Sequence, residues 1–226
     1  MAATVARIIT VIVGLAASFA GMFYLAGRID WTQGWIFVVV LTVGQSLNGI
    51  YVLLKNPEVI AARRRPGEGT KAWDKVLLSL FGLAYVGIMV VGALDSGRYA
   101  WSSMPLWTCG VGAGLYALNL ALASWAMGVN RHFEKTARIQ SDRNHAVVEA
   151  GPYRYIRHPG YAGAAFGWSV AGPLLLGSWW AFVPAGVMVL VLAIRTALED
   201  RMLRRELDGY AEYAARVRYQ IVPGIW

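Results

Sequence analysis

The stretch YAGAAFGWSVAGPLLLGSWWAFVPAGVMVLVLAI, residues 161–194, carries no charged side chain. One helical crossing of a bilayer takes about 20 mostly apolar residues, so this stretch is too long for a single crossing. Its middle, Gly177-Ser178-Trp179-Trp180, is flanked by Pro173 and Pro184. Because glycine and proline interrupt helices, the stretch predicts a tight hairpin of two membrane helices.

Four further apolar stretches precede this hairpin, and each is long enough to cross a bilayer. They are Ala6–Ala26, Gly34–Leu54, Val76–Leu94 and Leu106–Met127. Of the 226 residues, 57% are hydrophobic and only 15% are charged, which is too apolar for a soluble domain of this size. We therefore expect an all-α, polytopic membrane protein with five to six transmembrane helices and a cytoplasmic C-terminal helix.

The basic residues predict the orientation. Nineteen of the 21 Lys and Arg residues are Arg7 or lie in blocks at 55–75, 131–157 and 195–218, whereas the other short loops carry only Arg28 and Arg98. With six crossings, all three blocks share one face, which the positive-inside rule makes cytoplasmic. The net charge of +8 is thus explained by topology, and we expect no nucleic-acid partner.

Small and aromatic residues in the apolar stretches predict packing. Gly110 with Gly114, and Gly163 with Gly167, are pairs that let helices approach closely, and no strand precedes them as a nucleotide-binding loop would require. The single cysteine, Cys109, is interpreted as a packing residue. Tryptophans near expected helix ends are typical of interface anchors: Trp31, Trp35, Trp101, Trp107, Trp179 and Trp180.

Polar and charged side chains that could form a functional site are concentrated between Met127 and Ala165, where all three histidines lie. The spacing of His132, His145 and His158 matches no short metal-ligand motif, and no cysteine completes one, so we expect no metal site. Proline after His158 presets a turn, and the connector 153–157 combines tyrosines with arginines. It suits an amphipathic ligand. The alternative is that Arg154 and Arg157 contact lipid phosphates while Tyr153 and Tyr155 anchor the interface.

Arg195 and Glu199 are four residues apart on the last apolar helix and therefore share one face. Ionisable residues at membrane depth are costly and indicate a functional site, although an ordinary ion pair at a helix end is the alternative. The charged residues that follow predict a solvated amphipathic helix without a chemical role: Arg201, Arg204, Arg205, Glu206, Asp208 and Glu212.

At these residues the sequence resembles the isoprenylcysteine carboxyl methyltransferase family, including its prokaryotic relatives. The resemblance covers residues 127–226 and rests on an ordered set of short motifs: His145-Ala146-Val147-Val148, Gly151-Pro152-Tyr153, Arg157-His158-Pro159-Gly160-Tyr161, Arg195, Glu199-Asp200, Gly209-Tyr210, Arg216-Val217 and Pro223-Gly224. We accordingly divide one integrated domain into four N-terminal transmembrane helices, residues 1–127, and a catalytic core, residues 128–226.

The resemblance implies a membrane methyltransferase that uses S-adenosylmethionine, with its active site facing the cytoplasm. It implies a lipophilic or prenylated acceptor, with membrane lipid around the opening. Arg195 would meet the substrate, and Arg157 is the second catalytic candidate. The family often has a glutamine a few residues before His145, but the spacing around Gln140 is shifted. The implied cofactor-binding residues are His145, Ala146, Val147, Val148, Tyr153, His158, Pro159, Gly160, Tyr161 and Glu199.

Two other functions remain open. Membrane sterol and steroid reductases use NADPH and share a similar Arg-His-Pro turn, but the pattern of Arg195 and Glu199-Asp200 favours the methyltransferase. A transporter or scaffold is disfavoured because the apolar helices hold no relay of ionisable groups and no repeat. The acceptor group stays open between carboxylate, amine and phenol, with His145 or His158 as base for the last two. The oligomeric state also stays open.

Overall fold

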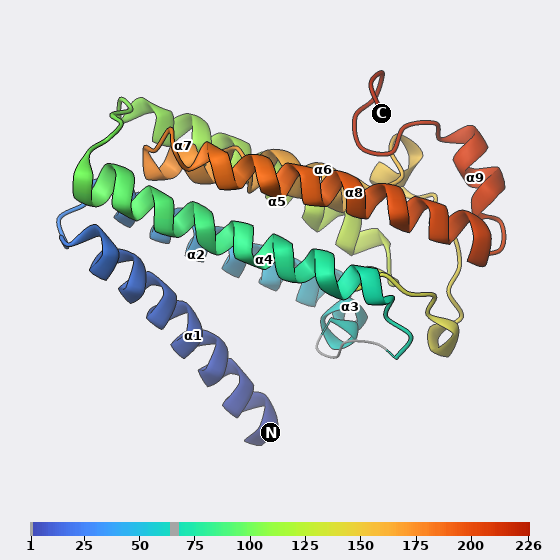
Figure 1. Cartoon of the computed structure of the whole chain (residues 1–226). Coiled ribbons are helices and arrows are strands. Elements are labelled where there is room, and N and C mark those ends of the chain that lie inside the picture. Colours follow the sequence, from blue (N-terminus) through green and yellow to red (C-terminus); the bar gives the residue numbers. More distant parts are fainter. Residues whose placement is uncertain (1, 64–67) are drawn as a thin grey trace.

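The computed structural model describes residues 2–63 and 68–226, and these ranges fold into helices without a strand. Long helices run side by side in a bundle (Figure 1). In chain order, the elements are α1 (Ala2–Ala26), α2 (Thr32–Lys55), α3 (Pro57–Ala62), α4 (Ala72–Gly92), the π-helix η1 (Ala93–Tyr99), α5 (Trp107–Val129), the short 3-10 helices η2 (Ser141–Arg143) and η3 (Gly151–Arg154), α6 (Pro159–Gly167), α7 (Ala171–Leu176), α8 (Phe182–Glu206) and α9 (Tyr210–Arg216).

The long helices are membrane spans. Among the described residues, four helical segments are long and apolar enough to cross a bilayer: α2, α4 continued by η1, α5 and α8; Val13–Ala26 of α1 is a shorter apolar segment. Large aliphatic side chains on their outer faces are 60% to 70% exposed, such as Leu47, Leu83 and Leu190. Lipid is the solvent that suits such a surface. The expectation of an all-α, polytopic membrane protein is confirmed.

The hairpin has its turn where the sequence placed it, but its first arm is not one helix. Gly177 ends α7 with a φ of 67°, and the chain reverses before α8. The first arm divides into α6 and α7, separated by residues 168–170. Pro173 has no N–H to donate to the preceding turn, and its ring crowds the carbonyl there, which explains the interruption.

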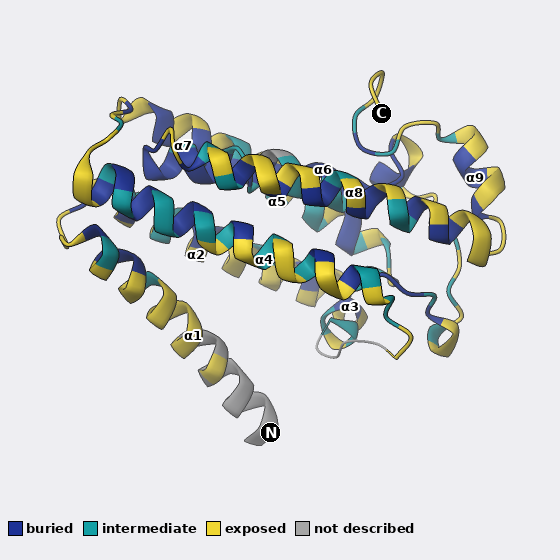
Figure 2. Cartoon of the chain, in the orientation of Figure 1, coloured by how far each residue is buried: buried dark blue, intermediate teal, exposed yellow. Residues whose placement is uncertain are grey.

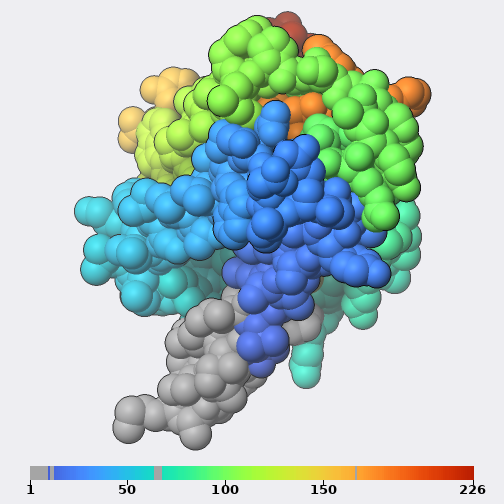
Figure 3. Space-filling view, turned by 90° about the vertical axis from the view of Figure 1, so that its left-hand side faces the viewer, coloured from blue at the N-terminus to red at the C-terminus, as the bar shows by residue number. Residues whose placement is uncertain are grey.

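The two ends of the bundle differ in character. Turns at 27–31, 100–106 and 177–181 gather at one end, where Figure 3 shows blue, green and orange surfaces meeting. Buried Asp95 ties two of them, because it accepts hydrogen bonds from Ser178 Oγ at 2.6 Å and from the Ser102 N–H at 2.7 Å. The opposite end carries α3, α9 and the polar loop before α6 (Figure 1).

Residues are buried where helices contact one another (Figure 2). Two packing predictions from the sequence are wrong. Trp31 is not an interface anchor, because it is buried against Phe23 with ring centroids 6.0 Å apart; the other five tryptophans are exposed. Gly110 and Gly114 face open space, since a Cβ there would meet nothing within 4 Å. Gly163 and Gly167, in contrast, lie directly against Asn119 of α5, as expected for a close helix pair. Cys109 is buried, in keeping with a packing role.

Candidate functional site

A cavity of about 450 Å³ opens among α4, α5, α6, α8 and the loop at 130–148, at the end of the bundle that carries α3 and α9. Its walls include every site residue predicted from the sequence. These are His145, Ala146, Val147, Val148, Tyr153, Arg157, His158, Pro159, Gly160, Tyr161, Arg195 and Glu199.

The turn into α6 is held by the C-terminal tail. The N–H groups of Arg157 and His158 donate to the carbonyls of Tyr219 and Gln220 at 3.0 and 2.8 Å. Pro159 then begins α6, where its missing N–H costs nothing because the first turn has no intrahelical acceptor. Gly160 lets the turn pack directly against Phe133, since a Cβ there would lie 2.6 Å from the ring of Phe133. The motif thus brings tail, turn and loop together at the cavity.

Arg157 lines the cavity, but its guanidinium is engaged elsewhere. Nε and Nη2 donate to Asp200 at 2.7 and 3.1 Å, and Nη1 donates to the carbonyls of Val217 and Arg218, each at 2.7 Å. Arg157 and Asp200 are both buried. With these donors used, Arg157 acts as a positioning residue that joins the turn to α8 and the tail, rather than as a group offered to a substrate.

Asp200 collects further donors around the same turn. It accepts the hydroxyl of Tyr210 at 2.9 Å and Nε of Arg204 at 2.8 Å, and Nε2 of His158 lies 3.3 Å away. Tyr210 belongs to α9, so this carboxylate connects α6, α8 and α9 through hydrogen bonds to a charged group, which are stronger than neutral ones. The sequence pattern noted Asp200 beside Glu199 but gave it no role.

Arg195 and Glu199 both line the cavity but do not pair with each other. Arg195 donates from Nε and Nη2 to Asp74 of α4 at 2.6 and 3.3 Å, and from Nη2 to the carbonyl of Lys135 at 2.7 Å. Its Cζ lies 5.0 Å from the ring centroid of Tyr161, whose hydroxyl donates a short hydrogen bond to Glu199. The alternative of an Arg195–Glu199 ion pair is therefore wrong.

Asp74 is the main residue that the sequence reading missed. It is fully buried, and besides Arg195 it accepts the N–H of Ala137 at 2.7 Å. Asp74 thereby fixes the loop over the cavity to the start of α4. An acidic residue two positions before the apolar stretch at Val76 was the available signal, but its partner is 121 residues away.

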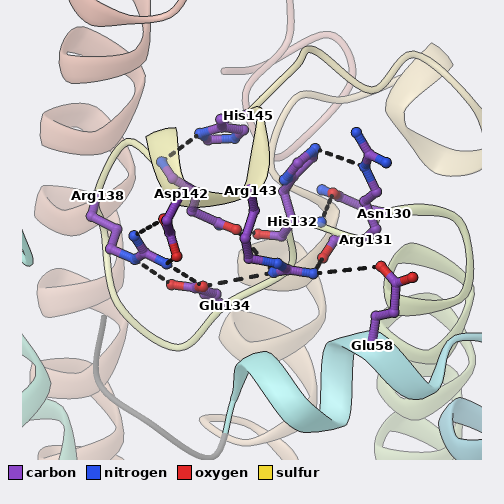
Figure 4. Close-up of polar contacts among 10 residues, drawn as sticks. Glu58, Asn130, Arg131, His132, Glu134, Arg138, Asp142, Arg143 and His145 are labelled. Atoms are coloured by element: carbon purple, nitrogen blue, oxygen red, sulfur yellow. Dashed lines mark hydrogen bonds and ion pairs between the residues drawn. The ribbon is translucent and has the colours of Figure 1, made fainter. Parts of the chain in front are cut away.

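The loop at 130–148 is built from charged contacts (Figure 4). Arg138 lies between Glu134, with both contacts at 2.8 Å, and Asp142 at 2.6 Å. Arg143 reaches Glu58 of α3 at 3.8 Å and so joins the loop to α3. These pairs include a buried guanidinium, Arg138, which holds the loop in one conformation.

The two histidines of this loop accept hydrogen bonds, and Nδ1 of His145 accepts the N–H of Gln140 at 3.3 Å. Burial, followed by the charges of His132, Arg138 and Arg143, lowers the pKa of His145 to about 4. Burial and Arg131 lower the pKa of His132. Nε of Arg131 donates to Nε2 of His132 at 3.2 Å, which assigns the ring proton of His132 to Nδ1, a buried atom with no partner among the described residues.

Gln140 and Tyr153 complete the polar wall. The Gln140 side chain lines the cavity and donates to the carbonyl of His132 at 2.6 Å, although its position could not be matched from the sequence. The hydroxyl of buried Tyr153 accepts from Asn130 at 2.9 Å, and burial raises its pKa, so the phenol stays protonated. Aromatic faces, carboxylates and buried cations thus surround one space that can accept a ligand with both charges. No three His, Cys, Asp or Glu side chains of the described chain converge as metal ligands.

Comparison with known protein families gives a match over part of the chain. Residues 113–205 match the model of the isoprenylcysteine carboxyl methyltransferase family. No curated protein matches the chain. Among solved structures, the eukaryotic intramembrane Ras methyltransferase isoprenylcysteine carboxyl methyltransferase, determined without a monobody, is similar over 96% of this chain and 86% of its own, with 13% sequence identity and a TM-score of 0.48.

Proposed function

We propose that this chain is a membrane methyltransferase of the isoprenylcysteine carboxyl methyltransferase family, whose model matches residues 113–205. We further propose that it methylates a carboxylate of a lipophilic acceptor with S-adenosylmethionine as donor. The acceptor class, the donor and the cytoplasmic orientation are the finer parts of the proposal. One observation carries them: the segments 145–161 and 195–199, far apart in sequence, line the same cavity at the basic end of the bundle.

The walls of the cavity suit the donor in size and chemistry. A volume of about 450 Å³ lies within the range of small-molecule sites. S-adenosylmethionine, when bound, would supply an electrophilic methyl group on a sulfonium cation. Glu199 offers a carboxylate to that cation, and the rings of Tyr153 and Tyr161 offer faces to the cation or the adenine. The unpaired Nδ1–H of His132 offers a further buried donor close by.

The methyl acceptor must be oriented beside the donor, but it does not need to lose a proton. A carboxylate acceptor is ionised at neutral pH and therefore needs no general base. Arg195, fixed by Asp74 and by the carbonyl of Lys135, would hold such an acceptor in line beside the donor. The apolar wall contributed by Leu192 and Trp168 would exclude water and receive the lipophilic part. The positive-inside rule places the basic loops, and the cavity with them, on the cytoplasmic side of the membrane.

Calorimetric titration with S-adenosylhomocysteine separates the proposed roles. Glu199→Gln keeps the size of the side chain but removes its charge, so we expect at least a tenfold loss of affinity, or about 1.4 kcal/mol. Arg195→Lys should bind with the wild-type affinity while its rate of methyl transfer falls. Glu212→Gln, on the exposed face of α9, is the matched control. Equal affinity in wild type and Glu199→Gln would contradict the assignment of Glu199.

A further inference from the structure

Four arginines line the cavity, and one of them, Arg63, comes from the N-terminal half of the chain. Arg63 follows α3, is half-buried and lines the cavity together with Arg195. Its Cζ lies 5.3 Å from the ring centroid of Phe133, within the range of a cation–π contact. Arg63 lies outside the residues that match the family model.

The position of Arg63 is set by α3. Val59 of α3 is fully buried against Val52 of α2 and Met127 of α5, so this short helix lies across the end of the bundle. On its other side, Glu58 faces Arg143 of the loop (Figure 4). Because buried Val59 fixes α3 and the Arg63 N–H donates to the Val59 carbonyl at 2.9 Å, the fold sets the backbone position of Arg63.

Unlike the other buried arginines of this end, Arg63 has no carboxylate partner among the described residues, and residues 64–67 contain no acidic side chain. Arg195 is neutralised by Asp74, and Arg157 by Asp200. Burial, followed by the positive charge of Arg195, lowers the pKa of Arg63. Burial and Arg63 in turn lower the pKa of Lys135, which also lines the cavity.

Of the two carboxylates that line the cavity, Glu134 pairs with Arg138 and Glu199 accepts the hydroxyl of Tyr161. Arg63 and Lys135 therefore have no carboxylate partner among the described residues. A desolvated cation without a partner is costly, and an anionic ligand placed between such cations removes the cost. Asp74 cannot also compensate Arg63 and Lys135, because both of its oxygens are already engaged by Arg195 and by the Ala137 N–H.

We propose that Arg63, assisted by Lys135, binds the anionic group of the methyl acceptor opposite Arg195. The inference rests on the proposed function and adds a specificity residue to it. An acid would be held by two guanidinium groups, whereas its methyl ester is neutral and would be held by neither. Arg63 would therefore select unmethylated acceptors and favour release of the product.

The test compares an acid with its own methyl ester. N-acetyl-S-farnesylcysteine and its methyl ester are titrated into the full-length protein saturated with S-adenosylhomocysteine, in dodecyl maltoside, which carries no phosphate. We expect wild type to bind the acid at least tenfold more tightly than the ester. Arg63→Gln should reduce this ratio to less than threefold by weakening the acid alone, and Arg63→Lys should retain an intermediate ratio.

Two controls make the result specific. Arg201→Gln removes the same charge from an exposed position of α8 and should leave the acid-to-ester ratio unchanged. The affinity for S-adenosylhomocysteine should be equal in wild type and Arg63→Gln. A lowered affinity for S-adenosylhomocysteine would instead assign Arg63 to the cofactor and overturn the proposal, as would an unchanged ratio in Arg63→Gln or no preference for the acid in wild type. Failure of wild type to bind S-adenosylhomocysteine at all would refute the proposed function itself.

Discussion

Individual side chains at the site are held in place by hydrogen-bond partners that lie far away in the sequence. Arg195 and Glu199 share one face of their helix, as the sequence spacing predicts, and both line the cavity; their functional roles stay predictions. The spacing could not predict that Arg195 pairs with Asp74 and that Glu199 receives the hydroxyl of Tyr161, because helical spacing describes only one helix. The partners come from packing between helices, which local patterns do not encode.

Because the fold keeps His145 neutral, we expect the stability of the protein to depend on pH. Its pKa of about 4 in the fold lies below the ordinary value of 6.5, so the unfolded chain binds more protons between these values. Stability should therefore fall as the pH decreases from about 6.5 towards 4. Allowing for partial solvent exposure, we expect a loss of about 1 kcal/mol at pH 5, or about 2–4 °C in Tm.

The measurement is thermal unfolding in detergent at pH 7 and pH 5, without ligand. His145→Gln should show a smaller difference in Tm between the two pH values than wild type. The neighbouring His132, Arg138 and Arg143 are unchanged in this variant, so their own contributions cancel in the comparison. An identical pH dependence in both proteins would show that His145 is not held neutral by its surroundings.

At the scale of elements, composition predicted the helices better than their interruptions. The hairpin turn at Gly177 was predicted from a local glycine, whereas the division into α6 and α7 was missed. Likewise, both glycine pairs looked alike in the sequence, yet only the pair on α6 faces another helix. Which side of a helix faces protein and which faces lipid is decided by the neighbouring helices.

The two glycine pairs give a matched test of the packing of α5 on α6. A Cβ on Gly167 would lie 2.0 Å from Cβ of Asn119, so Gly167→Ala should force the helices apart and cost about 1–3 kcal/mol. Gly114→Ala meets nothing within 4 Å and should be neutral or stabilising by up to about 1 kcal/mol, through helix propensity. Thermal unfolding in detergent measures both; equal Tm values for the two variants would contradict this packing.

At the scale of the molecule, apolar lengths and the placement of basic residues were sufficient to predict an all-helical membrane bundle with one polar end. The motifs in residues 145–199 were sufficient to predict one part of the cavity wall. The other part, with Asp74 and Arg63, comes from the N-terminal half, where no motif marked a function. Its contribution depends on how α3 and α4 cross the end of the bundle, which only the fold determines.

If these two halves enclose a site for a methyl donor, the purified wild-type protein binds S-adenosylhomocysteine and does not bind NADPH. Separate titrations with the two ligands measure this. We expect saturable binding of S-adenosylhomocysteine at one site per chain and no binding of NADPH. Binding of NADPH without binding of S-adenosylhomocysteine would refute a methyl-donor site and favour a reductase.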